Sequence, residues 1–174
     1  MNTENPTPLR LGLSGRISGQ EYRIVGRAAM STEFDGQTYG WNEFLMQTPS
    51  GQRATLVYED QEEAPQWKLF VSLAESSSIS LDSVTALKVG DPLVLEGRST
   101  RVTFTGTSVV NFAEGELPEG MTTGVVDQYL NAESGTVLYV ISWRPGRLEV
   151  FRGMNLPTYA VETAFRVTMP TSKP

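Results

Sequence analysis

Trp41 and Glu43 are the residues of this sequence whose types and spacing most directly suggest a binding site. In an extended segment, residues two apart share a face, so Trp41, Glu43 and Leu45 lie on one side of the expected strand. A carboxylate between such neighbours is partly desolvated, which raises its pKa unless an Arg or a backbone N–H compensates. Beside an aromatic wall it suits an amine or a peptide N–H. The alternative is a structural strand in which Glu43 pairs with Arg23 or Arg53.

A second candidate is the acidic segment 114–119, which carries three carboxylates within six residues. With Asp127 further on, it could supply oxygen ligands to a hard cation such as Ca²⁺ or Mg²⁺. The Asp/Asn pattern of a calcium loop is missing, so a solvated acidic loop is the alternative. Glu114 and Glu116 are the binding candidates taken from this segment.

The sequence contains no His and no Cys. This excludes thiolate nucleophiles, Ser-His-Asp and Cys-His arrangements, disulfides, and metal or haem sites that need imidazole or sulfur. We therefore predict no catalytic residues, no cofactor and no metal, and expect a protein that is not an enzyme. Catalysis by paired carboxylates is the remaining enzymatic alternative.

The net charge is −6, with 14 basic against 20 acidic residues. A nucleic-acid-binding protein is expected to present a basic face, so no nucleic-acid partner is predicted. The first eight residues are polar, and no stretch approaches the roughly 20 apolar residues of a membrane span. We expect a cytoplasmic protein without direct membrane insertion.

An internal similarity at an offset of 78 residues relates segments 9–25 and 87–103. Leu-Arg-Leu-Gly at 9–12 aligns with Leu-Lys-Val-Gly at 87–90, and two glycines stay in register. Downstream, segments 44–71 and 129–151 follow the same order, namely a hairpin with a Ser-Gly turn, a second turn and another strand. Chance similarity between β-rich stretches is the alternative to duplication.

These patterns predict an all-β fold made of two tandem related halves of about five short strands each. The halves could be SH3-like small barrels or meander sheets, or could share one sandwich. The expected boundaries are 7–75 for the first repeat, 76–85 for a Ser-rich linker and 86–157 for the second repeat. Alternating apolar residues predict one extra C-terminal strand over 158–170.

Several short motifs spread along the chain resemble those of a bacterial family. The resemblance covers about residues 9–157 and identifies the chain as similar to the domain-of-unknown-function family numbered 4178. That family has no established activity, and its members often sit beside genes for membrane-stress proteins or polyamine synthesis. The resemblance therefore implies an accessory, non-catalytic role. The motifs are Leu11-Gly12, 22–26 (Tyr-Arg-Ile-Val-Gly), 41–44 (Trp-Asn-Glu-Phe), Gly51, Trp67, Val89-Gly90, 115–120 (Gly-Glu-Leu-Pro-Glu-Gly) and Gly153.

Two functional hypotheses follow. The first is a non-catalytic protein-binding or scaffold module. Its partner would be another protein, which the resemblance associates with membrane stress. An exposed sheet edge could bind this partner by strand addition. The second is binding of a small ligand, a polyamine or a divalent cation, in a groove between the halves. Trp41 and Glu43 motivate the second hypothesis, because aromatic rings and carboxylates together suit ammonium groups.

Overall fold

The computed structural model describes residues 3–60, 64–73 and 79–170. Within these residues it contains ten strands and two short helices. In chain order they are β1 (Ser14–Ile17), β2 (Gln20–Phe34), β3 (Gln37–Gln47), β4 (Arg53–Glu59), β5 (Gln66–Ser72), α1 (Leu81–Thr85), β6 (Pro92–Leu95), β7 (Arg98–Gly115), β8 (Val126–Ser134), β9 (Val137–Arg144), β10 (Arg147–Leu156) and α2 (Thr158–Phe165).

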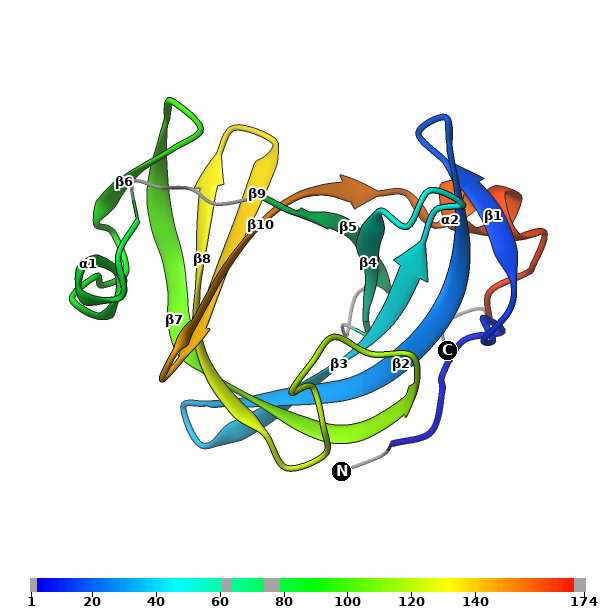
Figure 1. Ribbon diagram of the computed structural model, residues 1–174, viewed down its shortest axis with the longest axis horizontal. Coiled ribbons are helices and arrows are strands. Elements are labelled where there is room, and N and C mark those ends of the chain that lie inside the picture. The colour runs from blue at the N-terminus through cyan, green and yellow to red at the C-terminus, as the bar shows by residue number, and fades with distance from the viewer. Residues whose placement is uncertain (1–2, 61–63, 74–78, 171–174) are drawn as a thin grey trace.

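Eight of the strands form one closed antiparallel barrel, visible end-on as a ring in Figure 1. The order around the ring is β2-β3-β4-β5-β10-β9-β8-β7, and β7 pairs with β2 to close it. The all-β prediction is confirmed. The expected pair of SH3-like barrels or separate sheets is wrong, because the β5–β10 and β2–β7 pairings join strands from both predicted repeats into a single sheet.

The two remaining strands, β1 and β6, extend the sheet as short hairpins with β2 and β7. Both hairpins turn through a residue with positive φ followed by a glycine with positive φ, Ser18-Gly19 and Glu96-Gly97. Each long strand then carries a bulge, between Ile24 and Gly26 in β2 and between Val102 and Phe104 in β7. A bulge bends a strand locally, which here lets β2 and β7 leave the hairpin and enter the barrel.

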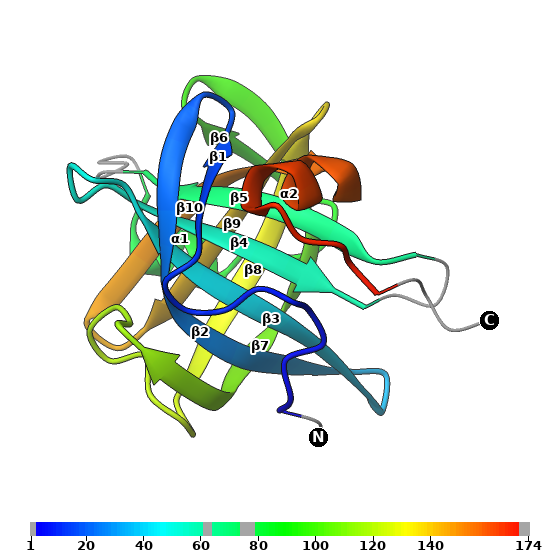
Figure 2. The same ribbon diagram turned by 90° about the vertical axis from the view of Figure 1, so that its right-hand side faces the viewer.

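Two apolar clusters lie outside the barrel wall, beneath the segments that cover it. On one side, Phe44, Leu56 and Trp67 of the wall pack under α2 and the β1–β2 hairpin. On the other side, outward residues of β8, β9 and β10 pack under α1 and β6, including the fully buried Leu130 and Ile141. Figure 2 shows α2 lying across the outer face of the strands. The parts of the strands beneath these segments are therefore buried on their outer face, and their inner face lines the interior.

The predicted C-terminal strand over 158–170 is wrong, because residues Thr158–Phe165 form the helix α2. Val161 and Phe165 are 0% and 4% exposed, and their spacing of four places both on one face of a helix. Arg166 ends the helix in the left-handed conformation, where its N–H donates to the carbonyl of Glu162. The β-branched residues also fit a strand, and packing of the helical face against the barrel decides between the two.

The described part of the expected Ser-rich linker is not an open connection. Ser80 caps α1, and it exchanges reciprocal hydrogen bonds with Ser83 in a capping box. Val84, in the helix, is fully buried in the second apolar cluster. Residues 76–78 of the predicted linker lie outside the described residues. Neither helix is long and apolar enough to cross a membrane, in the part of the chain that the structure covers.

Candidate functional site

Trp41 and Glu43 project into the barrel from β3, together with Leu45. Phe44 and Met46, which alternate with them, are buried in the outer cluster. The predicted division of faces along this strand is therefore observed. The indole Nε1 of Trp41 donates a 2.9 Å hydrogen bond to Oε1 of Glu43, so the two residues form one unit. Glu43 makes no ion pair with Arg23 or Arg53, the partners expected for a purely structural strand.

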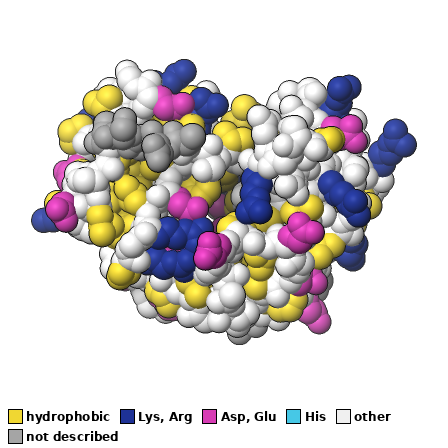
Figure 3. All heavy atoms as spheres, in the orientation of Figure 1, with side chains coloured by type: hydrophobic (Ala, Val, Ile, Leu, Met, Phe, Trp, Pro, Cys, Tyr) yellow, Lys and Arg dark blue, Asp and Glu magenta, His cyan; other side chains and the backbone are white. Residues whose placement is uncertain are grey.

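The barrel encloses a cavity of about 500 Å³, a volume within the range of small-molecule sites. Figure 3 views the ring as in Figure 1 and shows basic and acidic side chains together over its middle. Charged residues from most of the wall contribute to the lining. The acidic ones are Glu43, Glu59, Glu116, Asp127, Glu133 and Glu149, and the basic ones are Arg53, Lys68 and Arg147.

The position of Glu43 raises its pKa above the ordinary value of 4.5. Burial is the largest cause, because a charge is disfavoured away from water. The hydrogen bond from Trp41 acts in the opposite direction, and the nearby carboxylates of Asp127 and Glu149 raise the pKa further. Burial therefore outweighs the hydrogen bond from Trp41 in its effect on the pKa of Glu43.

The neighbouring carboxylates of the interior have basic partners. Lys68 Nζ lies 2.6 Å from Glu59 Oε1. Arg147 lies 2.8 Å from Glu149, and Arg144 lies 3.5 Å from Asp127. Among the residues that the structure describes, no Lys or Arg nitrogen lies within 4.0 Å of the Glu43 carboxylate. Glu43 is therefore a half-buried carboxylate of the interior with no ion pair among the described residues.

A row of aromatic rings runs from the tip of the β2–β3 hairpin toward the Glu43 carboxylate. Phe34, 55% exposed, lies 5.5 Å from Phe104 between ring centroids. Phe104 lies 5.4 Å from Tyr129, which lies 6.2 Å from Trp41. Gly106 permits this arrangement, because a Cβ there would meet the Phe104 ring at 2.7 Å. This row of rings places aromatic side chains beside Glu43.

The segment 116–125, between β7 and β8, folds over one end of the barrel. Arg144 donates a 3.0 Å hydrogen bond to the carbonyl of Gly120, and Arg147 donates to the carbonyl of Glu119. Met121 and Glu116 line the cavity from this segment. The same two arginines that pair with Asp127 and Glu149 thus also hold the cover of the barrel in place.

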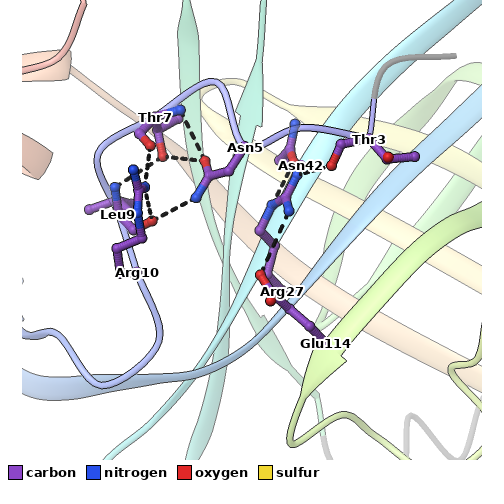
Figure 4. Close-up of polar contacts among 8 residues, drawn as sticks. All are labelled: Thr3, Asn5, Thr7, Leu9, Arg10, Arg27, Asn42 and Glu114. Carbon is purple, nitrogen blue, oxygen red and sulfur yellow. Dashed lines mark hydrogen bonds and ion pairs between the residues drawn. The ribbon is translucent and has the colours of Figure 1, made fainter.

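Glu114 does not share the interior with Glu43. It lies 3.7 Å from Arg27, which is 3% exposed and donates to Asn42 Oδ1 at 2.8 and 3.0 Å. Arg27 also donates to the carbonyl of Thr3 at 2.7 Å, on the outer side of the wall (Figure 4). Of the two acidic candidates, only Glu116 reaches the cavity. No group of three or more acidic side chains within the described ranges could hold a metal ion.

Sequence reasoning did not find most of the interior residues. No motif points to Tyr129, Lys68, Arg147 or Glu149, and Asp127 is only a further carboxylate beyond the acidic segment 114–119. Their shared signal is a polar or aromatic residue at every second position of a strand whose other face is apolar. That signal identifies a face, but it does not say that the polar face points into a barrel.

The fold and the interior define the chain as a small closed antiparallel β barrel with a polar, ligand-sized cavity. The family model for a domain of unknown function (DUF4178) matches residues 10–158, and the chain belongs to that family. Comparison with curated proteins and with solved structures finds no match.

Proposed function

We propose that this protein binds a small organic cation inside its barrel. The observation that carries the proposal is Glu43, whose carboxylate faces the cavity with a Trp41 N–H on one oxygen and no described basic partner. Trp41 and Tyr129 stand beside it, and aromatic faces attract ammonium groups. An ammonium group at this position would compensate the buried charge and contact the aromatic wall at the same time.

The composition and size of the cavity support this proposal. Among the described residues, six carboxylates and three basic side chains line it, which favours a cation over an anion. Eight-stranded barrels are wide enough to hold one small ligand. The binding location differs from the groove between two halves, because the halves share one barrel. A divalent cation lacks the oxygen cluster that it requires in the described part of the chain.

A thermal-shift screen of the full chain tests the proposal. The panel contains alkylamines, spermidine, Mg²⁺, Ca²⁺, and neutral and anionic compounds of matched size. An amine present at 100 times its Kd is expected to stabilise the fold by about 2.7 kcal/mol. Glu43→Gln should abolish the shift, whereas Glu114→Gln, the same change outside the barrel, should retain it. Absence of a shift with every amine at millimolar concentration would exclude the proposal.

Protein binding is a second proposal, supported by the outermost strand β6. It pairs only with β7 in the described sheet, and its Val94 is 62% exposed. A free edge of this kind can accept a strand from a partner. Capture of interacting proteins from host lysate by the wild-type chain and by Val94→Lys tests it. A partner that binds both forms equally would not use this edge.

We also propose that the two hairpins arose by duplication of one segment. Gly12 N–H donates to the carbonyl of Ile24, and Gly90 N–H donates to the carbonyl of Val102, so both contacts recur at the offset of 78. The two bulges recur at the same offset. Sequences of further family members would test this proposal, because duplication predicts that the two segments are more similar to each other in some of them.

A further inference from the structure

The two oxygens of the Glu43 carboxylate differ in what they contact. Oε1 accepts the 2.9 Å hydrogen bond from Trp41 Nε1. No described group donates a hydrogen bond to Oε2. An ionised carboxylate oxygen can accept further hydrogen bonds, so Oε2 can receive an N–H from a ligand. A quaternary ammonium has no N–H to donate, and a primary amine does.

The charges around Glu43 limit how many positive charges a ligand can carry. Glu59, Asp127 and Glu149 already pair with Lys68, Arg144 and Arg147. The two other acidic residues of the lining, Glu116 and Glu133, are exposed and therefore solvated. Among the described residues, Glu43 is thus the half-buried carboxylate of the lining without an ion pair. A second ammonium on the same ligand would be desolvated without a partner, which is costly.

Apolar side chains line the cavity between these charged groups, and Val57 lies directly opposite Glu43 on the neighbouring strand. Val57 and Phe70 are buried, at 7% and 8% exposure, on the inner faces of β4 and β5. Leu45, Val140 and Phe151 line the same cavity. Apolar walls favour a hydrocarbon body, since burial of apolar surface contributes roughly 25 cal/mol per Å².

From these three observations we infer that the ligand of the barrel is an amine whose ammonium group carries an N–H, with one positive charge and an apolar body, bound through that group to Glu43. This inference rests on the proposed function and narrows it. The inferred ligand class excludes polyamines, which carry several charges, and neutral alcohols, which carry none.

Calorimetric titration of the full chain with three probes of equal chain length tests the inference. The probes are hexylamine, hexane-1,6-diamine and hexan-1-ol. Hexylamine is expected to bind at least about tenfold more tightly than either of the others, a difference of about 1.4 kcal/mol. The alcohol has no charge to pair with Glu43, and the diamine leaves its second ammonium unpaired. If the diamine or the alcohol binds as tightly as hexylamine, the inference about the ligand class is wrong, whereas the proposal that the barrel binds a small ligand is retained. If none of the three binds, the inference is wrong, and the thermal-shift panel decides whether the barrel binds any other organic cation.

Variants of two arginines on β10 probe the charge argument directly. Arg147→Gln removes the basic partner of Glu149, so the diamine should gain affinity relative to hexylamine by about tenfold. Arg152→Gln is the matched control, because Arg152 pairs at 3.0 Å with Glu96 and neither residue lines the cavity. An unchanged preference in a folded Arg147→Gln chain would overturn the inference.

A third variant, Glu43→Gln, tests the role of the charge without relying on Arg147→Gln. Glu43→Gln retains an acceptor for Trp41 and removes the charge. It should weaken hexylamine binding about tenfold or more and leave hexan-1-ol binding unchanged. Equal losses for both probes would show a general disturbance of the cavity and would count against a role for the charge.

Discussion

Trp41 donates its indole N–H to Glu43 inside the barrel, across a distance of 2.9 Å and from the same strand. The contact compensates one carboxylate oxygen only in part, since the pKa of Glu43 is still raised. A structural ion pair would normally neutralise a carboxylate at this depth. The retained charge is the feature from which the proposed function follows.

The stability of the protein should depend on pH through Glu43. A carboxyl whose pKa is higher in the folded chain than in the unfolded chain binds more protons when folded, so the free energy of unfolding falls as pH rises above about 4.5 toward the folded pKa. Glu43→Gln removes the titrating group and therefore this pH-dependent decrease in the free energy of unfolding. The variant should match the wild type near pH 4 and be increasingly more stable as pH rises, until the difference levels off.

Urea unfolding at a series of pH values measures this difference. Glu133→Gln is the control, because Glu133 is exposed at the end of β8. A stability difference between Glu43→Gln and the wild type that stays constant from pH 4 to pH 8 would contradict the prediction.

Gly153 should not tolerate a side chain, because the ring of Phe70, its partner on the neighbouring strand β5, lies against it. A Cβ built at Gly153 would lie 2.4 Å from Phe70 ring atoms. We expect Gly153→Ala to destabilise the fold by about 1–3 kcal/mol, as overpacking does. Gly153→Ala combined with Phe70→Leu should recover part of this loss. Thermal unfolding of the wild type, the two single variants and the double variant measures the coupling. Additive losses would show that the two residues do not interact.

The helix α2 should contribute to the stability of the barrel itself. Phe165 is 4% exposed and lies in the outer cluster with Phe44 and Trp67. Phe165→Ala should lower the free energy of unfolding by about 3–5 kcal/mol. Tyr159→Ala, in the same helix but 70% exposed, should change it by less than about 0.5 kcal/mol. Equal effects in urea unfolding would mean that the helix does not cover the core.

Arg27 and Glu114 should differ in their effect on stability, although they form one ion pair. Arg27 is buried and holds Asn42 and the Thr3 carbonyl, so Arg27→Met should cost about 2–3 kcal/mol by leaving these acceptors unpaired. The Glu114 side chain is 43% exposed, so Glu114→Gln should cost less than about 1 kcal/mol. Chemical denaturation of both variants measures the free energies of unfolding. A larger loss of stability for Glu114→Gln than for Arg27→Met would contradict the prediction.

Local patterns in the sequence were sufficient for several features. The alternation around Glu43 places it with Trp41 on one face of a strand, because side chains alternate with a period of two in any extended segment. The glycines of the hairpins occur where the backbone has positive φ, as at Gly19 and Gly97. The all-β class and the family follow from the same local information. None of these features depends on which strands meet.

Features that depend on distant pairing were decided only by the tertiary structure. The sequence does not say that Met30 of β2 lies opposite Val110 of β7, and this pairing turns two expected halves into one barrel. Closure then makes the face of Glu43 the interior, and it leaves Glu114 outside. Likewise, residues Thr158–Phe165 fit either a strand or a helix locally, and the apolar surface of the barrel selects the helix. The physical reason is that strand alternation identifies two faces, whereas strand pairing and packing between distant segments determine which face is enclosed.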